Sequence, residues 1–241
     1  MFRSCAVCFA LAALLLVAPI AYAGQAVATS IATNGGSSSA TAVAHGNAAA
    51  TADAVATNGG RAIANSEAVG RGNGVAISNS IAIADRGLAV SNSRADARAR
   101  HGSVALAVSE STAATVGGTA ISNSVAEADA RRNAFADSRS TSLALSRFGF
   151  ANSDSHAVSD GWRGGRAVAV SDSIADTEFG VADSRVRAHA GARLFGSANA
   201  NGLGVSLSRR GRHADARVTA ISRSERWGRS QSDAAVVEVR P

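Results

Sequence analysis

The sequence predicts an all-β protein, a β-solenoid or β-roll in which coils of about 15–16 residues stack around a narrow core of alanine and serine. Three observations support this fold class. Glycine recurs at a nearly constant interval, small residues occupy almost every second position between the glycines, and proline is nearly absent. Repeats this short cannot bury a face alone, so they become stable by stacking on their neighbours.

The glycine interval sets the length of the repeating unit. Two evenly spaced series comprise Gly72, Gly87, Gly102 and Gly117, then Gly149, Gly165, Gly180, Gly196 and Gly211. Asn133 lies midway between the series, and asparagine tolerates a left-handed turn almost as glycine does. Upstream the interval is slightly shorter, as between Gly46 and the pair Gly59-Gly60. Each of these positions therefore marks a predicted turn.

Alternation between the glycines indicates extended strands. In the stretch 74–85, Ala76 and Ser78 share one side of the chain, while Ile77 and Ile81 share the other. A period of two residues is typical of a strand. Alanine is a strong helix former, but a helix would distribute these alanines around its whole circumference. We therefore expect the alanine and serine side inside the coils and the variable side in solvent.

Aromatic residues occupy a recurrent place in the units. Phe148, Phe179 and Phe195 each immediately precede a glycine of the turn series, and Trp227 precedes Gly228, which follows Gly211 one residue later than the interval predicts. Stacked coils would align these rings as a ladder along one edge of the solenoid, where they stabilise the stack.

Two alternatives use the same pattern. The alternation also fits a silk-like or antiparallel stacked sheet, and the composition also fits a largely disordered chain. The only prolines are Pro19 and Pro241, as continuous hydrogen-bonded ladders require. The case for disorder is strongest for residues 24–60, which are rich in alanine, threonine, glycine and asparagine and carry few charges.

Residues 1–23 are predicted to be a secretory signal peptide. Arg3 precedes an apolar run, and Ala21-Tyr22-Ala23 matches the small-x-small pattern of a cleavage site. Cleavage before Gly24 would leave a secreted chain, with surface attachment or a periplasmic location left open. No later stretch approaches the roughly 20 apolar residues of a membrane span, so no transmembrane segment is expected in the mature chain.

The mature chain divides into three predicted parts. Residues 24–60 form a low-complexity segment with irregular repeats, 61–228 form the β-repeat domain, and 229–241 form a C-terminal strand or cap. Both cysteines, Cys5 and Cys8, lie in the leader, so disulfides are not expected to stabilise these parts.

The composition argues against catalysis. Without the leader, the chain has no lysine, cysteine or tyrosine, which removes Schiff-base chemistry, thiol nucleophiles and phosphate-binding P-loops. The five histidines are far apart in sequence, without the spacing of a zinc site. We therefore expect no enzyme activity, no cofactor and no metal site.

Arginine is the residue type with the clearest functional signal. All 24 Lys+Arg residues are arginine, and removal of Arg3 lowers the formal net charge of +6 to about +5. Guanidinium groups bind phosphate and carboxylate in bidentate fashion. Acidic residues alternate with many arginines and are expected to pair with them between coils. The candidate contacts for a polyanion are Arg94, Arg98, Arg100, Arg185, Arg187, Arg209, Arg210 and Arg212.

The segment 79–89, NSIAIADRGLA, resembles the head repeats of trimeric autotransporter adhesins, and Asn123-Ser124-Val125-Ala126 repeats its beginning. The resemblance extends over about residues 60–230. It implies a parallel β-roll, often trimeric, that is displayed for attachment to host matrix.

These observations favour a secreted structural or adhesion-type repeat protein that acts through its surface and through self-association, as a trimer or end to end. The alternative is a module that binds a polyanion, such as lipopolysaccharide, nucleic acid or an acidic glycan, through its arginines.

Overall fold

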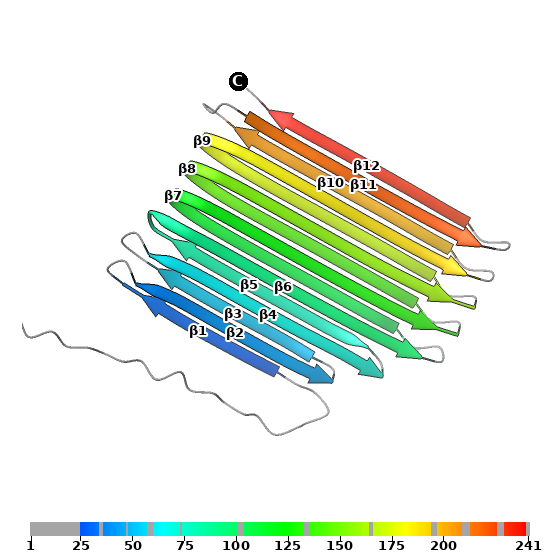
Figure 1. Cartoon of the computed structure of the whole chain (residues 1–241). Helices are drawn as coiled ribbons and strands as arrows, with labels where there is room; N and C mark the ends of the chain where they lie inside the picture. Colours follow the sequence, from blue (N-terminus) through cyan, green and yellow to red (C-terminus); the bar gives the residue numbers. More distant parts are fainter. Residues whose placement is uncertain are drawn as a thin grey trace, which may run out of the picture.

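The computed structural model describes residues 25–33, 36–46, 48–56, 60–72, 74–100, 104–132, 135–163, 166–193, 197–208, 213–225 and 229–239. These ranges contain twelve strands and no helix (Figure 1). The strands are β1 (Gln25–Ala32), β2 (Ser37–Gly46), β3 (Ala48–Ala56), β4 (Arg61–Gly72), β5 (Val75–Ala84), β6 (Gly87–Arg100), β7 (Val104–Arg131), β8 (Phe135–Trp162), β9 (Arg166–Arg193), β10 (Ser197–Ser208), β11 (His213–Glu225) and β12 (Arg229–Val239).

The strands pair in parallel, and their register gives the length of a coil. Val104 pairs with Phe135, and Phe135 pairs with Arg166, so the chain returns to the same position after about 31 residues. The predicted β-solenoid with an alanine and serine core is thus confirmed, and the pairing is parallel rather than antiparallel. The predicted coil length of about 15–16 residues is corrected to about 31, because each unit between two glycines forms only one side of a coil and the chain turns twice to close it.

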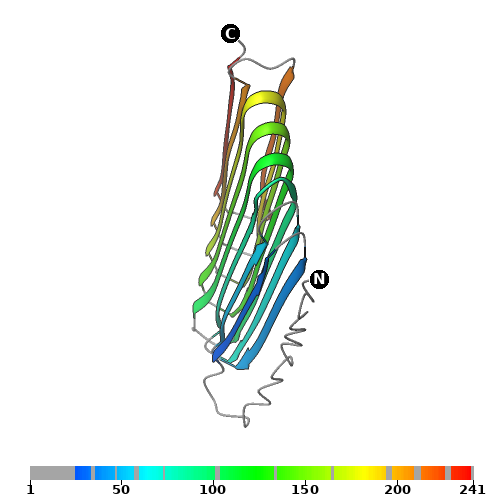
Figure 2. The same cartoon turned by 90° about the vertical axis from the view of Figure 1, so that its left-hand side faces the viewer.

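The coils form two facing layers, which Figure 2 shows nearly edge-on. Strands β7, β8 and β9 each bend once, at 116–118, 147–149 and 178–180, and so contribute a segment to both layers. The first layer contains β1, β3, β5, the first segments of β7–β9, β10 and β12. The second layer contains β2, β4, β6, the second segments of β7–β9, and β11.

The coils are shorter at the N-terminal end. Gln25 pairs with Ala49, and Arg61 pairs with Leu88, so each of these coils closes after fewer residues than the coil from Val104 to Phe135. From β5 onward the coils have their full length of about 31 residues. The strands described within the irregular segment 24–60, β1 to β3, therefore belong to the same solenoid as the other described strands, and the shorter glycine interval reflects shorter coils.

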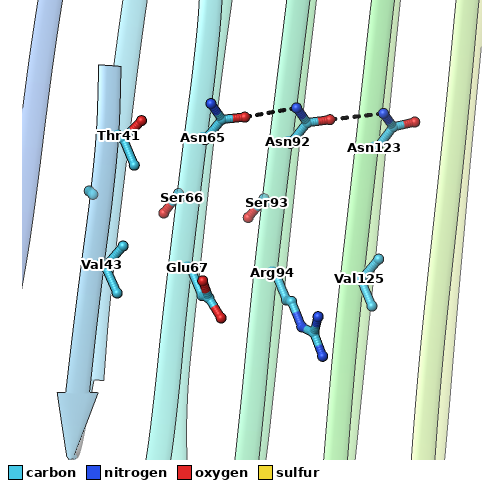
Figure 3. A pocket seen from close by; sticks show the side chains of 11 residues that line it. Thr41, Val43, Asn65, Ser66, Glu67, Asn92, Ser93, Arg94, Asn123 and Val125 are labelled. Carbon is cyan, nitrogen blue, oxygen red and sulfur yellow. Dashed lines mark hydrogen bonds between the residues drawn. The ribbon is translucent and has the colours of Figure 1, made fainter. Parts of the chain in front are cut away.

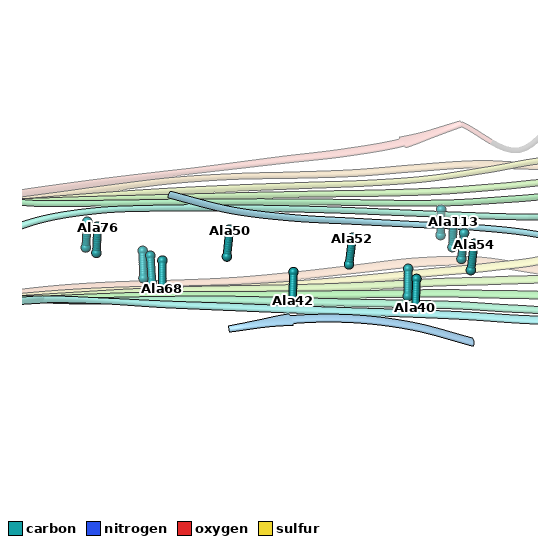
Figure 4. Packing of buried hydrophobic residues seen from close by; sticks show 14 of the residues in the cluster. Ala40, Ala42, Ala50, Ala52, Ala54, Ala68, Ala76 and Ala113 are labelled. Atoms are coloured by element: carbon teal, nitrogen blue, oxygen red, sulfur yellow. The ribbon is translucent and has the colours of Figure 1, made fainter. Parts of the chain in front are cut away.

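The space between the layers is filled by small side chains (Figure 4). Serines form the central stripe, and their hydroxyls donate hydrogen bonds across to main-chain carbonyls of the opposite layer. Examples are Ser80 to Ala64 at 2.8 Å and Ser111 to Ser91 at 2.7 Å. Alanines such as Ala95 and Ala126, with no exposed surface, form stripes beside the serines. One serine side chain and one hydrogen bond span the gap, so a larger side chain fits only where the residue opposite it is smaller.

Where a larger residue enters the core, the opposite layer provides room for it. Val186 replaces the serine of the neighbouring coil, Ser155, and is fully buried. Gly202 and Gly204 lie opposite. A Cβ atom added at Gly202 would lie 3.0 Å from Val186 and 2.8 Å from Val218, closer than ordinary van der Waals contact. The core is thus packed by matching valine with glycine.

One corner of the solenoid is a column of stacked glycines. Gly87, Gly118, Gly149 and Gly180 pair in successive coils, and the last three have φ values of 135°, 138° and 153°. A Cβ atom at any of these three would clash with the carbonyl oxygen of the preceding glycine in the column. Glycine is required here both for its backbone conformation and for the close approach of the coils.

The predicted aromatic ladder forms only in part. Phe148 and Phe179 stack at 5.1 Å between ring centroids, with 7° between the ring planes. Phe195 and Trp227 lie outside the described residues. Trp162 is at the other corner, where the guanidinium of Arg193 lies 5.0 Å from its ring centroid. The prediction that all the aromatic rings line one edge was wrong, because successive units end at opposite corners of the solenoid.

Candidate functional surfaces

The outer side of the second layer, here called the charged face, carries the described candidate arginines. Arg94, Arg98 and Arg100 extend from β6, and Arg185 and Arg187 extend from the second segment of β9. The register aligns Arg94 with Val125, His156 and Arg187 in successive coils. The remaining candidates, Arg209, Arg210 and Arg212, lie outside the described residues.

Acidic partners neutralise much of this arginine set. Arg98 pairs with Asp96 at 3.2 Å, and Arg185 pairs with Asp183 at 3.0 Å. Both are pairs within one strand, between alternate residues, where we had expected pairing between coils. Arg94 does pair between coils, with Glu127 at 3.7 Å. Exposed pairs of this kind contribute little to stability, but they reduce the positive potential that a polyanion would meet.

Arg187 differs from these residues because it makes no ion pair with any residue in the described ranges. Its positive charge affects the pKa values of His156 and Asp154. The pKa of His156 is lowered, chiefly by burial and then by the positive charge of Arg187. The pKa of Asp154 is raised by burial, against the opposing effects of Arg185 and Arg187. Burial also raises the pKa of Asp160, which His189 opposes.

A ladder of asparagines crosses the N-terminal half of the charged face (Figure 3). Asn92 Nδ2 donates to Asn65 Oδ1 at 2.8 Å, and Asn123 Nδ2 donates to Asn92 Oδ1 at 2.9 Å. Beside the ladder is a groove of about 300 Å³, whose lining includes Glu67 and Arg94. The amides bond to one another from coil to coil, so the ladder stabilises the stack as well as lining the groove.

The outer side of the first layer, here called the aliphatic face, is of a different kind. In β5 the outward residues Val75, Ile77, Ile81 and Ile83 surround a single asparagine, Asn79. The register continues this character only in part, because the charged residues Glu110, Asp137, Arg139 and Asp172 occupy the same outward rows in the following coils. The aliphatic residues aligned there are Leu106, Val108, Leu143, Leu145, Val168, Val170, Ile174, Leu203, Val205 and Leu207.

Sequence analysis missed the aliphatic face because it treated all variable positions as one solvent-facing side. Two layers separate alternate units onto opposite outer faces. The signal was present in the sequence: the unit around Ile77 and Ile81 is aliphatic, whereas the next unit carries Arg94, Asp96 and Arg98. Large exposed apolar patches on proteins mark contact surfaces more often than isolated apolar residues do.

Metal clusters, membrane helices and similarity to known proteins were the remaining features to compare with the sequence. No cluster of three or more histidine, aspartate or glutamate side chains is placed to hold a metal ion in the described part of the chain. Within the same ranges, no helix has the length and hydropathy to cross a membrane. No protein-family model, no curated protein and no solved structure matches the chain.

Proposed function

We propose that this chain is a secreted structural or adhesion-type protein that acts through its surface and by self-association, with the aliphatic face as its main contact. The observation that carries this proposal is the concentration of valine, isoleucine and leucine on one flat outer face, opposite a charged one. Burying such a face removes apolar area from water, which is the main driving force of association.

The aliphatic face is large enough for a stable contact. Eight strands run across it. With about 4.8 Å between strands and about ten residues of about 3.3 Å each, it covers about 1,300 Å². Two copies packed face to face would bury about 2,500 Å², which exceeds the roughly 1,600 Å² of a standard protein interface. A second copy is therefore an adequate partner for this face.

Matched isoleucine substitutions test the proposal. Ile81→Arg places a charge on the aliphatic face, and Ile221→Arg places one on the charged face; the two side chains are 40% and 51% exposed. Sedimentation velocity of the purified exported protein should show that Ile81→Arg abolishes face-to-face assemblies, while Ile221→Arg leaves them intact. Equal behaviour of the two variants would count against the aliphatic face as the contact.

The secreted location rests on residues 1–23. Arg3, the apolar run after it and the sequence Ala21-Tyr22-Ala23 support export followed by cleavage. Amino-terminal sequencing of the exported protein should give Gly24 as the first residue.

Polyanion binding is the second candidate, and Arg187 favours it. Its guanidinium has no ion-pair partner in the described ranges, and Arg185 and Arg217 lie on the neighbouring row of the same face. Retention on heparin that disappears by about 0.2 M salt is the expected sign of phosphate- or sulfate-like contacts. Arg187→Gln should weaken retention, while Arg139→Gln on the aliphatic face should not.

A further inference from the structure

The two ends of the solenoid are open sheet edges of different character. Among the strands that the structure describes, β1 at the N-terminal end pairs only with β3, and β2 pairs only with β4. At the C-terminal end, β12 pairs only with β10 and β11 only with β9, again among the described strands. Each of these strands therefore presents main-chain N–H and C=O groups that no described strand satisfies, and such edges readily pair with another chain.

The C-terminal edge carries charges that oppose such pairing. Arg229, Asp233 and Glu238 all lie on β12. The Glu238 carboxylate also accepts a 3.0 Å hydrogen bond from the main-chain nitrogen of Ala216, on the open side of β11. Edge charges and a carboxylate that occupies an edge N–H both block the approach of a further strand.

The N-terminal edge has none of these features in its described strands. β1 (QAVATSIA) and β2 (SSSATAVAHG) contain no arginine, aspartate, glutamate or proline. Val27 and Ile31 of β1 are 67% and 65% exposed. The Ser38 hydroxyl donates to the main-chain carbonyl of Ser30 at 2.7 Å, which ties the two edge strands together. Uncharged, β-branched edge strands without proline are typical of strands that pair between chains.

We propose that this N-terminal edge is an interface with a second copy of the same chain, which pairs head to head. β1 would pair with β1 of the second copy and β2 with its β2, both antiparallel, about a two-fold axis perpendicular to the layers. This inference deepens the proposed self-association by assigning a second, separate contact to one end of the molecule.

Strand length favours a second N-terminal edge over a C-terminal one. The N-terminal edge strands β1 and β2 are shorter than the C-terminal edge strands β12 and β11. Head-to-head pairing therefore joins edges of equal length and equal lack of charge. It also closes the assembly at two copies, because the interface is self-complementary and the outer ends are the protected ones. Both aliphatic faces then lie on the same side of the dimer.

Lysines on β2 provide the first test, since they leave the aliphatic face unchanged. The double variant Thr41→Lys, Val43→Lys brings like charges together across the antiparallel junction. Sedimentation should show loss of the end-to-end dimer, with circular dichroism unchanged. The matched control, Thr219→Lys with Ile221→Lys, places the same charges on β11 at the other end and should keep the dimer. A dimer that survives in the β2 variant would overturn the inference.

Cysteine crosslinking provides a test that does not depend on charge. Thr29 of β1 and Val237 of β12 occupy the same row of the first layer at opposite ends, and Cys5 and Cys8, the chain's two cysteines, both precede β1. In exported protein, Thr29→Cys should give a disulfide-linked dimer under mild oxidation, and Val237→Cys should not. Crosslinking through Val237→Cys, or through neither, would refute head-to-head pairing.

The experiments can refute the N-terminal edge contact and the aliphatic-face contact independently of each other. Crosslinking of Thr29→Cys that persists when Ile81→Arg is added would show that the end contact exists without the face contact. Loss of assembly only on Ile81→Arg, with no effect of the β2 lysines, would leave the proposed function intact and remove the end contact.

Discussion

Ser91 Oγ donates a 2.6 Å hydrogen bond to the main-chain carbonyl oxygen of Ser80, which lies in the opposite layer. The same bond recurs one coil further on, from Ser122 to Ser111 at 2.7 Å. The distance between the layers is thus set by a serine side chain, and this spacing explains why alanine and serine dominate the core. Two layers this close also leave two outer faces exposed, on which the proposed function depends.

Two substitutions at Ser122 should distinguish the stability that the hydrogen bond contributes from the cost of adding volume between the layers. Ser122→Ala removes the bond to Ser111 and should reduce the free energy of unfolding by about 1 kcal/mol. Ser122→Val adds volume in addition and should cost about 1–3 kcal/mol more, because the opposite layer cannot move away. Urea denaturation measures both. The outward Ile121→Val should stay within about 0.5 kcal/mol of wild type. Equal stability of Ser122→Val and wild type would contradict the close spacing.

The alanine stripes should be still less tolerant of added volume. Ala126 has no exposed surface, and Ala126→Leu should reduce the free energy of unfolding by about 3 kcal/mol or more, since no cavity can receive the larger side chain. Val125→Leu, on the outer side of the same strand, should have little effect. Thermal melts followed by circular dichroism would reveal the difference, and coincident melting curves for the two variants would argue against a packed interior.

The fold class and the content of the core could be predicted because alternation is a local property. Ala95 and Ala97 face inward in any extended arrangement that buries one side of the chain. The number of units in a coil could not be predicted from glycine spacing, because glycine marks both corners. Residues one full coil apart carried the missing information: Asn92 with Asn123, and Phe148 with Phe179.

The candidate site could be predicted only in part. Arg94, Arg98 and Arg187 do extend from one face, as their alternation with small residues indicated. The aliphatic face depends on which units stack on which, and this is a property of coil length rather than of any local pattern. Ion pairing within strands, as between Arg98 and Asp96, also became clear only when the coils were in place.

Gly149 and Gly117, two glycines at the same corner in successive coils, provide a matched test of the stacked glycine column. Gly149→Ala should destabilise the solenoid strongly or prevent folding, because its Cβ would clash with the carbonyl oxygen of Gly118 and its φ of 138° disfavours a side chain. Gly117→Ala should be tolerated, since its Cβ would make only a 3.7 Å contact with the Arg86 side chain. Thermal unfolding of the two variants gives the comparison. A normal melting curve for Gly149→Ala would show that the coils do not approach at this corner.

The free energy of unfolding should depend on pH through titrating groups of the charged face, one of which is His156. Burial and Arg187 lower its pKa in the folded protein, so the unfolded chain binds a proton more readily. The contribution of the neutral His156 side chain to stability is therefore present at neutral pH. It is lost as the pH falls through the ordinary histidine range, from about 7 to about 5. His156→Gln should become more stable relative to wild type over that interval, as measured by urea denaturation at each pH.

Asp160 should respond in the opposite direction. Burial raises its pKa, so the folded protein holds the proton more tightly than the unfolded chain does, and ionisation costs stability as the pH rises through the ordinary aspartate range and above. Asp160→Asn should therefore stabilise the protein at pH 7, with a benefit that shrinks toward pH 3. Because His189 favours the ionised form of Asp160, His189→Gln should enlarge the benefit of Asp160→Asn. A benefit that grows on acidification in the Asp160→Asn variant would show that the carboxylate is stabilised, rather than desolvated, by its neighbours.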